Sequence, residues 1–141
     1  CRTSGTTSTL SSVDQPAHGD FILNNSDWRS PQNANLWQGV NGVNNPCPIG
    51  YRLPTETELN AERLSWSSSN PAGALASPLK LPNAGYRKRQ DGSFQDVGAR
   101  GNYWSNTVNS NSSRQLMFGA GSAFLGGNER GNASSVRCIK D

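Results

Sequence analysis

Few residues of this 141-residue chain have the types and spacing that catalysis requires. A nucleophilic triad needs a histidine as its base, and the single histidine, His18, lies in a Ser-, Thr- and Gly-rich segment with no periodic pattern. Glu56, Glu58 and Glu62 could supply paired carboxylates, but a helix cap and a solvated helix face already explain them. We therefore expect no catalytic site, and the chain is predicted not to be an enzyme.

The three cysteines, Cys1, Cys47 and Cys138, could bind a metal or form disulfides. No Cys or His lies at the spacing of a zinc site, so we expect no metal and no cofactor. Cys47 lies between two prolines and Cys138 lies near the end of the chain, and we interpret these two as a disulfide. The bond would close a loop of about 90 residues and indicates an oxidising compartment. Cys1 is then either unpaired or partnered with something outside this sequence.

A recognition surface is predicted between Arg114 and Ser134. Alternate residues of a strand share a face, so Leu116 and Phe118 on one side leave Met117 on the other. After the next turn, the same alternation directs a second phenylalanine outward among small residues. Apolar groups on an otherwise polar or bare face are typical of a binding patch. The predicted ligand-binding residues are Gln115, Met117, Gly119, Ser122, Phe124, Gly126, Gly127, Asn128, Glu129 and Ser134.

A different strand register would change this interpretation, because a slip of one residue reverses every side chain. Met117 and Phe124 would then belong to the core, but Leu116 and Phe118 would become exposed, which is no better. We therefore keep the first register. Its expected inward-facing residues are Leu116, Phe118, Ala123, Leu125 and Val136.

One helix is predicted with a well-defined start. Pro54 ends a short extended run, and Thr55 and Glu58 have the spacing of a capping box. The helix is expected over residues 56–65 and is ended by the polar segment before Pro71. The residues expected on its buried face are Leu59, Ala61, Arg63, Leu64 and Trp66.

The rest of the chain has a β pattern. Strands are expected at 79–81, 85–87, 94–97, 101–105, 114–118, 122–125 and 134–139, with a hairpin turn at 90–93 and a polar loop at 106–113. Trp104 is expected in the core between sheet and helix, and Trp66 is also expected to be buried. Trp28 and Trp37 are interpreted as anchors under a loop, and sugar stacking is the alternative.

The composition bounds the class of protein. The length fits one domain, and 33% hydrophobic residues with four tryptophans can form a small core. Residues 1–20 are expected to be an irregular arm. The net charge is only +3, and the basic run 87–89 is interpreted as a solvated hairpin loop rather than a nucleic-acid patch. No stretch has the apolar length of a membrane helix, so a membrane-spanning protein is not expected.

Three segments, taken in order, carry a resemblance to a known family. They are Cys47-Pro-x-Gly-Tyr-Arg-Leu-Pro-Thr-x-x-Glu58, Gly101-x-Tyr-Trp-Ser105 and Ser135-Val-Arg-Cys-Ile139. From about Asp27 to its end the chain resembles the Fibrobacter succinogenes major paralogous domain. The resemblance implies an α+β, C-type-lectin-like fold with one main helix, a small twisted antiparallel sheet and long irregular loops. It also implies that an earlier segment of the domain precedes Cys1.

The C-type-lectin-like fold is shared by two functional groups. In the variable proteins of diversity-generating retroelements, a mutated template rewrites some codons, and the predicted ligand-binding residues resemble those rewritten positions. Formylglycine-generating enzymes instead need a reactive thiol near the C-terminus. Here Cys138 falls at the structural Val-Arg-Cys position of the family, with no second thiol beside it. A related enzyme is therefore the less favoured expectation.

Together these patterns predict an extracellular ligand- or receptor-binding domain that acts in adhesion. The expected carriers are a phage tail fibre tip, a bacterial surface lipoprotein or a secreted adhesin, and the expected localisation is extracellular, cell-surface or virion. The expected partner is a cell-surface protein or glycan receptor rather than nucleic acid, and the domain could belong to a larger fibre or oligomer. The alternative is a structural module of such an assembly without its own ligand.

Overall fold

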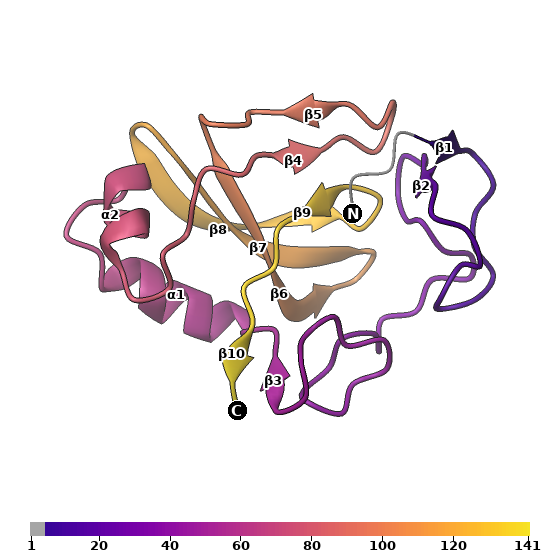
Figure 1. Cartoon of the computed structure of the whole chain (residues 1–141), viewed down its shortest axis with the longest axis horizontal. Helices are drawn as coiled ribbons and strands as arrows, with labels where there is room; N and C mark the ends of the chain where they lie inside the picture. Colours follow the sequence, from indigo (N-terminus) through magenta and orange to yellow (C-terminus); the bar gives the residue numbers. More distant parts are fainter. Residues whose placement is uncertain (1–4) are drawn as a thin grey trace.

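The fold is built around a three-stranded antiparallel sheet of order β6-β7-β8. Its strands are β6 (Gly101–Asn109), β7 (Ser112–Gly119) and β8 (Ser122–Glu129). In this computed structural model, which describes residues 5–141, the sheet lies between the two helices on one side and the N-terminal segment on the other (Figure 1). The molecule is therefore a mixed α+β domain with little helix.

The strands of this sheet are longer than the sequence predicts. The expected polar loop at 106–113 is instead a hairpin, in which β6 runs to Asn109 and β7 starts at Ser112. Polar side chains do not prevent pairing, because the ladder uses backbone groups and one face of an antiparallel sheet can meet solvent. Ser110, with a φ of 51°, takes the left-handed conformation that the tight turn needs.

The main helix, α1 (Glu56–Leu64), begins at the predicted capping box. Thr55 Oγ1 accepts from the Glu58 backbone N–H at 3.1 Å, and Glu58 Oε2 accepts from the Thr55 N–H at 2.8 Å. Leu59 is buried, but Ala61 and Leu64 are exposed, so the expectation that they widen the buried face was wrong. At 3.6 residues per turn, positions two and five beyond Leu59 point well away from it.

A second helix, α2 (Pro71–Ala76), was not predicted. Asn70 is its N-cap and accepts from the Gly73 backbone N–H at 3.1 Å, and Pro71 occupies the first helical position. Asn followed by Pro is a recognised helix start, but the proline was interpreted only as the end of α1. The buried residues Gly73 and Ala74 bring α2 against the core.

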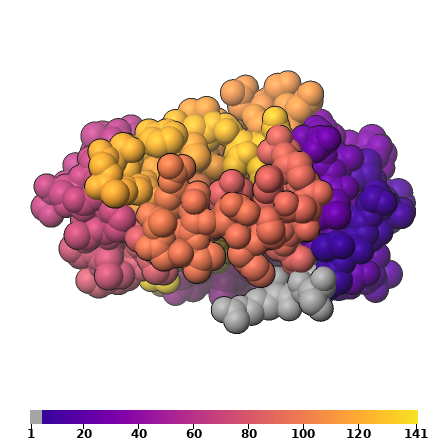
Figure 2. Space-filling model, turned by 90° about the horizontal axis from the view of Figure 1, so that it is seen from above, coloured from indigo at the N-terminus to yellow at the C-terminus, as the bar shows by residue number. Residues whose placement is uncertain are grey.

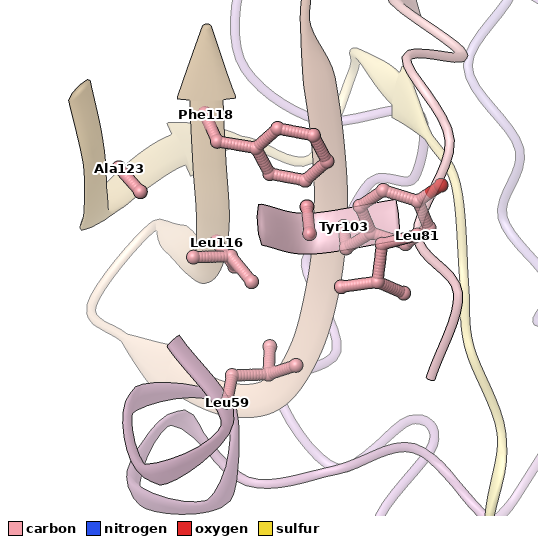
Figure 3. Packing of buried hydrophobic residues seen from close by; sticks show 7 residues of the cluster. Leu59, Leu81, Tyr103, Leu116, Phe118 and Ala123 are labelled. Carbon is pink, nitrogen blue, oxygen red and sulfur yellow. The ribbon is translucent and has the colours of Figure 1, made fainter. Parts of the chain in front are cut away.

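The main core lies between the helices and one face of the sheet (Figure 3). Its side chains point toward one another from α1, α2 and all three strands, and Trp66 packs edge-on against Phe118 with ring centroids 5.4 Å apart. Leu79 and Leu81 contribute from an irregular segment, not from the expected strand. The buried cluster consists of Leu59, Ala74, Leu81, Tyr103, Leu116, Phe118 and Ala123.

Two tryptophan expectations need correction. Trp66 is half-buried rather than buried. Trp104 is buried, with 5% of its surface exposed, but it lies on the face of the sheet away from the helices. Tyr103 occupies the place next to Phe118 instead, because adjacent residues of a strand point to opposite faces.

Three smaller sheets surround this centre. They are β5 (Phe94–Gln95), β4 (Tyr86–Arg87) and β9 (Ala133–Ser134); β10 (Ile139–Lys140) and β3 (Tyr51–Arg52); and the parallel pair β1 (Thr6–Thr7) and β2 (Phe21–Ile22). The predicted strand 134–139 is thus divided into β9 and β10, because Ser135 leaves β4 to bond the edge of β6. Most of residues 8–20 is irregular, and Cys1 lies outside the described residues.

The basic run 87–89 is not the solvated loop that was expected. Arg87 is buried, and its guanidinium carbon lies 4.3 Å from the centroid of the Phe21 ring. Its Nε donates to the Gly92 carbonyl at 2.7 Å. Arg89 Nε donates to the Asn25 carbonyl, so both arginines attach the N-terminal segment to the β4–β5 hairpin.

Neither helix in the described part of the chain is long and apolar enough to cross a membrane.

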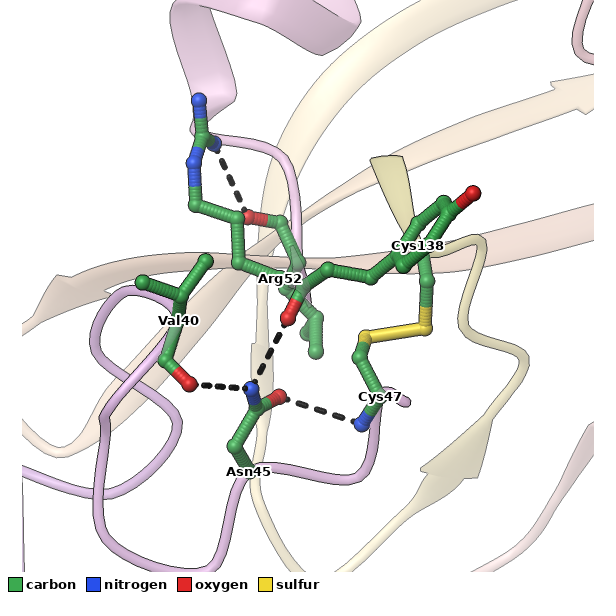
Figure 4. Close-up of a disulfide and its surroundings, with 7 residues drawn as sticks. Val40, Asn45, Cys47, Arg52 and Cys138 are labelled. Atoms are coloured by element: carbon green, nitrogen blue, oxygen red, sulfur yellow. Dashed lines mark hydrogen bonds between the residues drawn. A yellow bond between two sulfur atoms is a disulfide. The ribbon is translucent and has the colours of Figure 1, made fainter. Parts of the chain in front are cut away.

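The predicted disulfide between Cys47 and Cys138 is present (Figure 4). Asn45 orders the turn before β3, because its amide donates to the Tyr51 carbonyl and accepts from the Cys47 N–H. Beside it, Arg52 forms two 2.8 Å hydrogen bonds to Glu58 and one of 2.6 Å to Asp141. The end of the chain is therefore joined covalently to the turn before β3, and through Arg52 it is joined ionically to the start of α1.

Replacing both Cys47 and Cys138 by serine should lower the free energy of unfolding by about 4 kcal/mol. The reason is that the bond spans 91 residues and restricts the unfolded chain over that length. Denaturant unfolding of the variant, and of the native chain with and without reductant, measures the effect. Equal midpoints for the oxidised and reduced protein would contradict it.

Replacing Glu58 by glutamine should remove part of the acid sensitivity of the fold. Hydrogen bonds from Arg52 lower the pKa of Glu58 from 4.5 to about 2. The carboxylate therefore stabilises the fold above its ordinary pKa, and this contribution is lost as the pH falls through about 2. Because the side chain is 40% exposed, we expect only about 1 kcal/mol. The free energy of unfolding of both proteins is measured from pH 6 to pH 2. An equal decrease in the two proteins would refute this prediction.

Candidate functional site

The candidate site lies on the outer face of the β6-β7-β8 sheet, the face opposite the helices. Register places Met117 of β7 between Asn102 of β6 and Phe124 of β8. It likewise places Gln115 between Trp104 and Gly126. Since the other face forms the core with Leu116, Phe118 and Ala123, the strand alternation expected for these side chains is the one observed.

Met117 and Phe124 form an apolar ridge around Gly126. A Cβ at Gly126 would lie 2.4 Å from the Met117 Cε atom and 3.7 Å from the Phe124 ring, so both side chains lie over the bare backbone. Phe124 is 50% exposed and Met117 is half-buried. Next to them, the aliphatic part of the Arg100 side chain packs over Gly119, and this side chain is 67% exposed. The ridge is therefore apolar at its centre and polar at one end, where Arg100 pairs with Asp96.

Not all predicted ligand-binding residues reach this surface. Met117, Gly119, Ser122, Phe124, Gly126 and Asn128 share the outer face, and Ser134 lies over it. Gly127 and Glu129 pair with Arg114 and Ser112 on the helix side. The expected place of Gly127 on the outer face was wrong, because β8 continues to Glu129 and alternation continues with it.

Gln115 was also expected on the ligand-binding surface, but it is fully buried. The segment 130–135 folds back over this part of the sheet, and Ser134 Oγ donates to Gln115 Oε1 at 3.0 Å. Of the other predicted inward residues, Leu125 packs at the core margin and Val136 is half-buried. The amide nitrogens of Asn102 and Gln115 are buried and donate no hydrogen bond within residues 5–141. Buried polar groups are normally paired, so these two donors are unusual.

A cavity of about 310 Å³ lies beside the covered part of the outer face. The N-terminal segment supplies Trp28 and Trp37, and β6 supplies Trp104. Figure 2 shows the N-terminal segment in indigo at one end of the molecule, with the orange and yellow strands beside it. The sequence suggested that Trp28 and Trp37 either anchor a loop or stack on a sugar. It gave no indication that Trp104 lies beside them.

A buried ion pair joins the two sides of this cavity. Arg130 Nε lies 3.0 Å from Asp27 Oδ2, and the two side chains are 12% and 5% exposed. The Arg130 guanidinium also lies 3.5 Å from the Asn33 carbonyl and 3.4 Å from that of Ser110. Burial raises the pKa of Asp27, and the charge of Arg130 opposes that shift. Removing the arginine would leave a buried carboxylate without its partner.

Several other titratable groups have structural partners away from the cavity. Glu56 accepts from Arg114 Nε at 2.8 Å, which ties α1 to β7, and burial raises the pKa of Tyr103 to about 12. Within residues 5–141, no group of three or more His, Cys, Asp or Glu side chains could hold a metal ion.

Comparison of the chain with protein-family models, curated proteins and solved structures finds no match in any of the three.

Replacing Arg130 by alanine should lower the free energy of unfolding by about 3 kcal/mol at pH 7, since it isolates the Asp27 carboxylate. The loss should shrink on acidification, because protonation of Asp27 removes the unpaired charge. Arg100→Ala is the matched control, since its ion pair with Asp96 is exposed and should contribute less than about 1 kcal/mol. Equal losses for the two variants would show that the pair does not hold the cavity together.

Proposed function

We propose that this chain is an extracellular recognition domain with a C-type-lectin-like fold. It binds a cell-surface protein or glycan receptor through the apolar ridge of Met117 and Phe124 on the outer face. The single observation that carries the proposal is the exposure of Phe124, half of whose surface is left uncovered by residues 5–141 beside the half-buried Met117. The disulfide is compatible with the secreted, surface-attached or virion location that such a role requires.

The ridge has the features of a recognition surface. A half-exposed phenylalanine and a flexible methionine provide contact area, and Gly126 leaves the backbone open between them. Their burial by a partner would remove apolar surface from water, which is the main source of affinity at such patches. Ser122 and Arg100 provide a polar margin, as is usual around an apolar centre.

The ridge is also separate from what stabilises the fold. Met117 and Phe124 lie opposite the core cluster, and no ion pair or disulfide passes through them. Substitution at these positions can therefore alter binding with little effect on folding. This independence supports a role in recognition and fits the resemblance to proteins whose surface positions vary on a fixed scaffold.

The double variant Met117→Ser/Phe124→Ser should lose at least tenfold in binding to intact bacterial cells, because truncation of the few hot-spot residues of an interface costs about 2 kcal/mol or more each. The assay measures the labelled domain on a panel of strains to which the native protein attaches. The variant should keep its near-UV circular dichroism, and its melting temperature should fall by only a few degrees.

Leu64→Ser/Leu75→Ser is the matched control, since both leucines are more than half exposed but lie on the helices. This control should bind cells as the native domain does. If the ridge variant stays folded and binds normally, the recognition surface lies elsewhere. If the native domain binds no cell in the panel, the structural-module alternative replaces the proposal.

A further inference from the structure

Three of the four tryptophans line the cavity between the N-terminal segment and β6, and their indole N–H groups are free. Within residues 5–141, those of Trp28, Trp37 and Trp104 donate no hydrogen bond. The fourth, Trp66 on the helix side, donates to Glu62 Oε1 at 3.2 Å. Trp104 is buried and Trp28 and Trp37 are half-buried, and none of the three indole nitrogens is a fully buried atom, so a ligand in the cavity can reach them. The cavity therefore offers aromatic faces and unused donors together.

Polar side chains of the cavity are also unused. Asp20, Asn106 and Ser113 line it, and their side chains form no hydrogen bond or ion pair with any described residue. They provide a carboxylate acceptor, an amide that both donates and accepts, and a hydroxyl. A ligand that matches this set must carry several groups that both donate and accept, and hydroxyl groups are the simplest that do.

The charge of the cavity disfavours anionic ligands. Arg29 and Arg130 are neutralised by Asp14 and Asp27, at 2.7 and 3.0 Å. The charge that remains is the Asp20 carboxylate, which repels phosphates, sulfates and acidic sugars. An alkyl chain would satisfy the tryptophans but leave the polar side chains without partners. A neutral ligand with an apolar face and hydroxyl edges fits both requirements.

Size and backbone conformation narrow the choice further. At about 310 Å³ the cavity is at the lower end of the range of roughly 300–1,000 Å³ for small-molecule sites. Trp37 has a φ of 63°, a left-handed conformation that bulky residues rarely adopt. Such conformations concentrate where a side chain is held for binding. Trp37 thus lies at the wall of a space that suits one or two small rings.

We propose that this cavity binds a neutral sugar residue, with the C–H face of the ring stacked on tryptophan and its hydroxyls bonded to Asp20, Asn106 and Ser113. The weakly positive C–H groups meet the negative face of the indole ring. The site is distinct from the outer-face ridge, and the inference goes beyond the proposed function because it does not require the ridge to bind.

Ligand-observed saturation-transfer NMR tests the proposal on the full chain. The probes are neutral methyl glycosides of hexoses and of N-acetylhexosamines, with glucose 6-phosphate and N-acetyltyrosinamide as comparisons. At least one neutral glycoside should show saturable binding, and glucose 6-phosphate should bind at least tenfold more weakly than its neutral counterpart. Binding of N-acetyltyrosinamide alone would overturn the proposal in favour of a peptide site, and no binding by any glycoside would also overturn it.

Variants locate the binding. Ala34→Trp fills the cavity from its exposed rim and keeps every other wall residue, and Trp37→Gly removes the ring and suits the backbone conformation. Both should weaken glycoside binding at least tenfold, whereas Trp66→Phe, on the helix side, should not. Undiminished binding by the folded Ala34→Trp variant would refute the assignment. Met117→Ser/Phe124→Ser should retain glycoside binding, so failure of the ridge on cells and failure of the cavity are separate results.

Discussion

A sheet that carries helices on only one side must cover its other face with irregular chain or leave it to solvent. Here α1 and α2 pack on the side of Leu116 and Phe118, and no other helix exists in residues 5–141. The segment 130–135 covers the outer face near Trp104, and the part near Met117 remains open. The core, the covered patch and the ridge all follow from this one-sided arrangement.

The sequence was most informative where the rule is local. The capping box at Thr55 and the alternation of Leu116 with Met117 depend on neighbours within a few residues, and both were predicted correctly. Strand length was harder to predict, because polar residues at 106–113 resemble a loop while their backbone pairs as strands. The neighbouring strand was likewise expected to end at Leu125, so Gly127 was placed on the solvent-facing surface although it lies on the helix side.

The cavity could not be predicted, because it depends on contacts between distant segments. Asp27 and Arg130 are far apart in the sequence, and neither neighbourhood indicates that the two will pair. The meeting of Trp28 and Trp104 in the cavity was equally hard to predict, since a tryptophan in a hydrophobe-poor chain is usually part of a core. Gln115 shows the limit most clearly: its place on the strand was predicted, but its burial depends on a segment that returns much later.

The disulfide divides the chain into one part that tension can extend and one that it cannot. Under a pulling force on the two ends, Cys47 and Cys138 carry the load directly, so the residues between them are bypassed. Extension must then come first from the residues before Cys47. Trp28 and Trp37 belong to that extensible part, whereas Trp104 lies within the protected loop. Mechanical load would therefore open the cavity while the helix-side core stays intact, which makes the cavity the force-sensitive region of the domain.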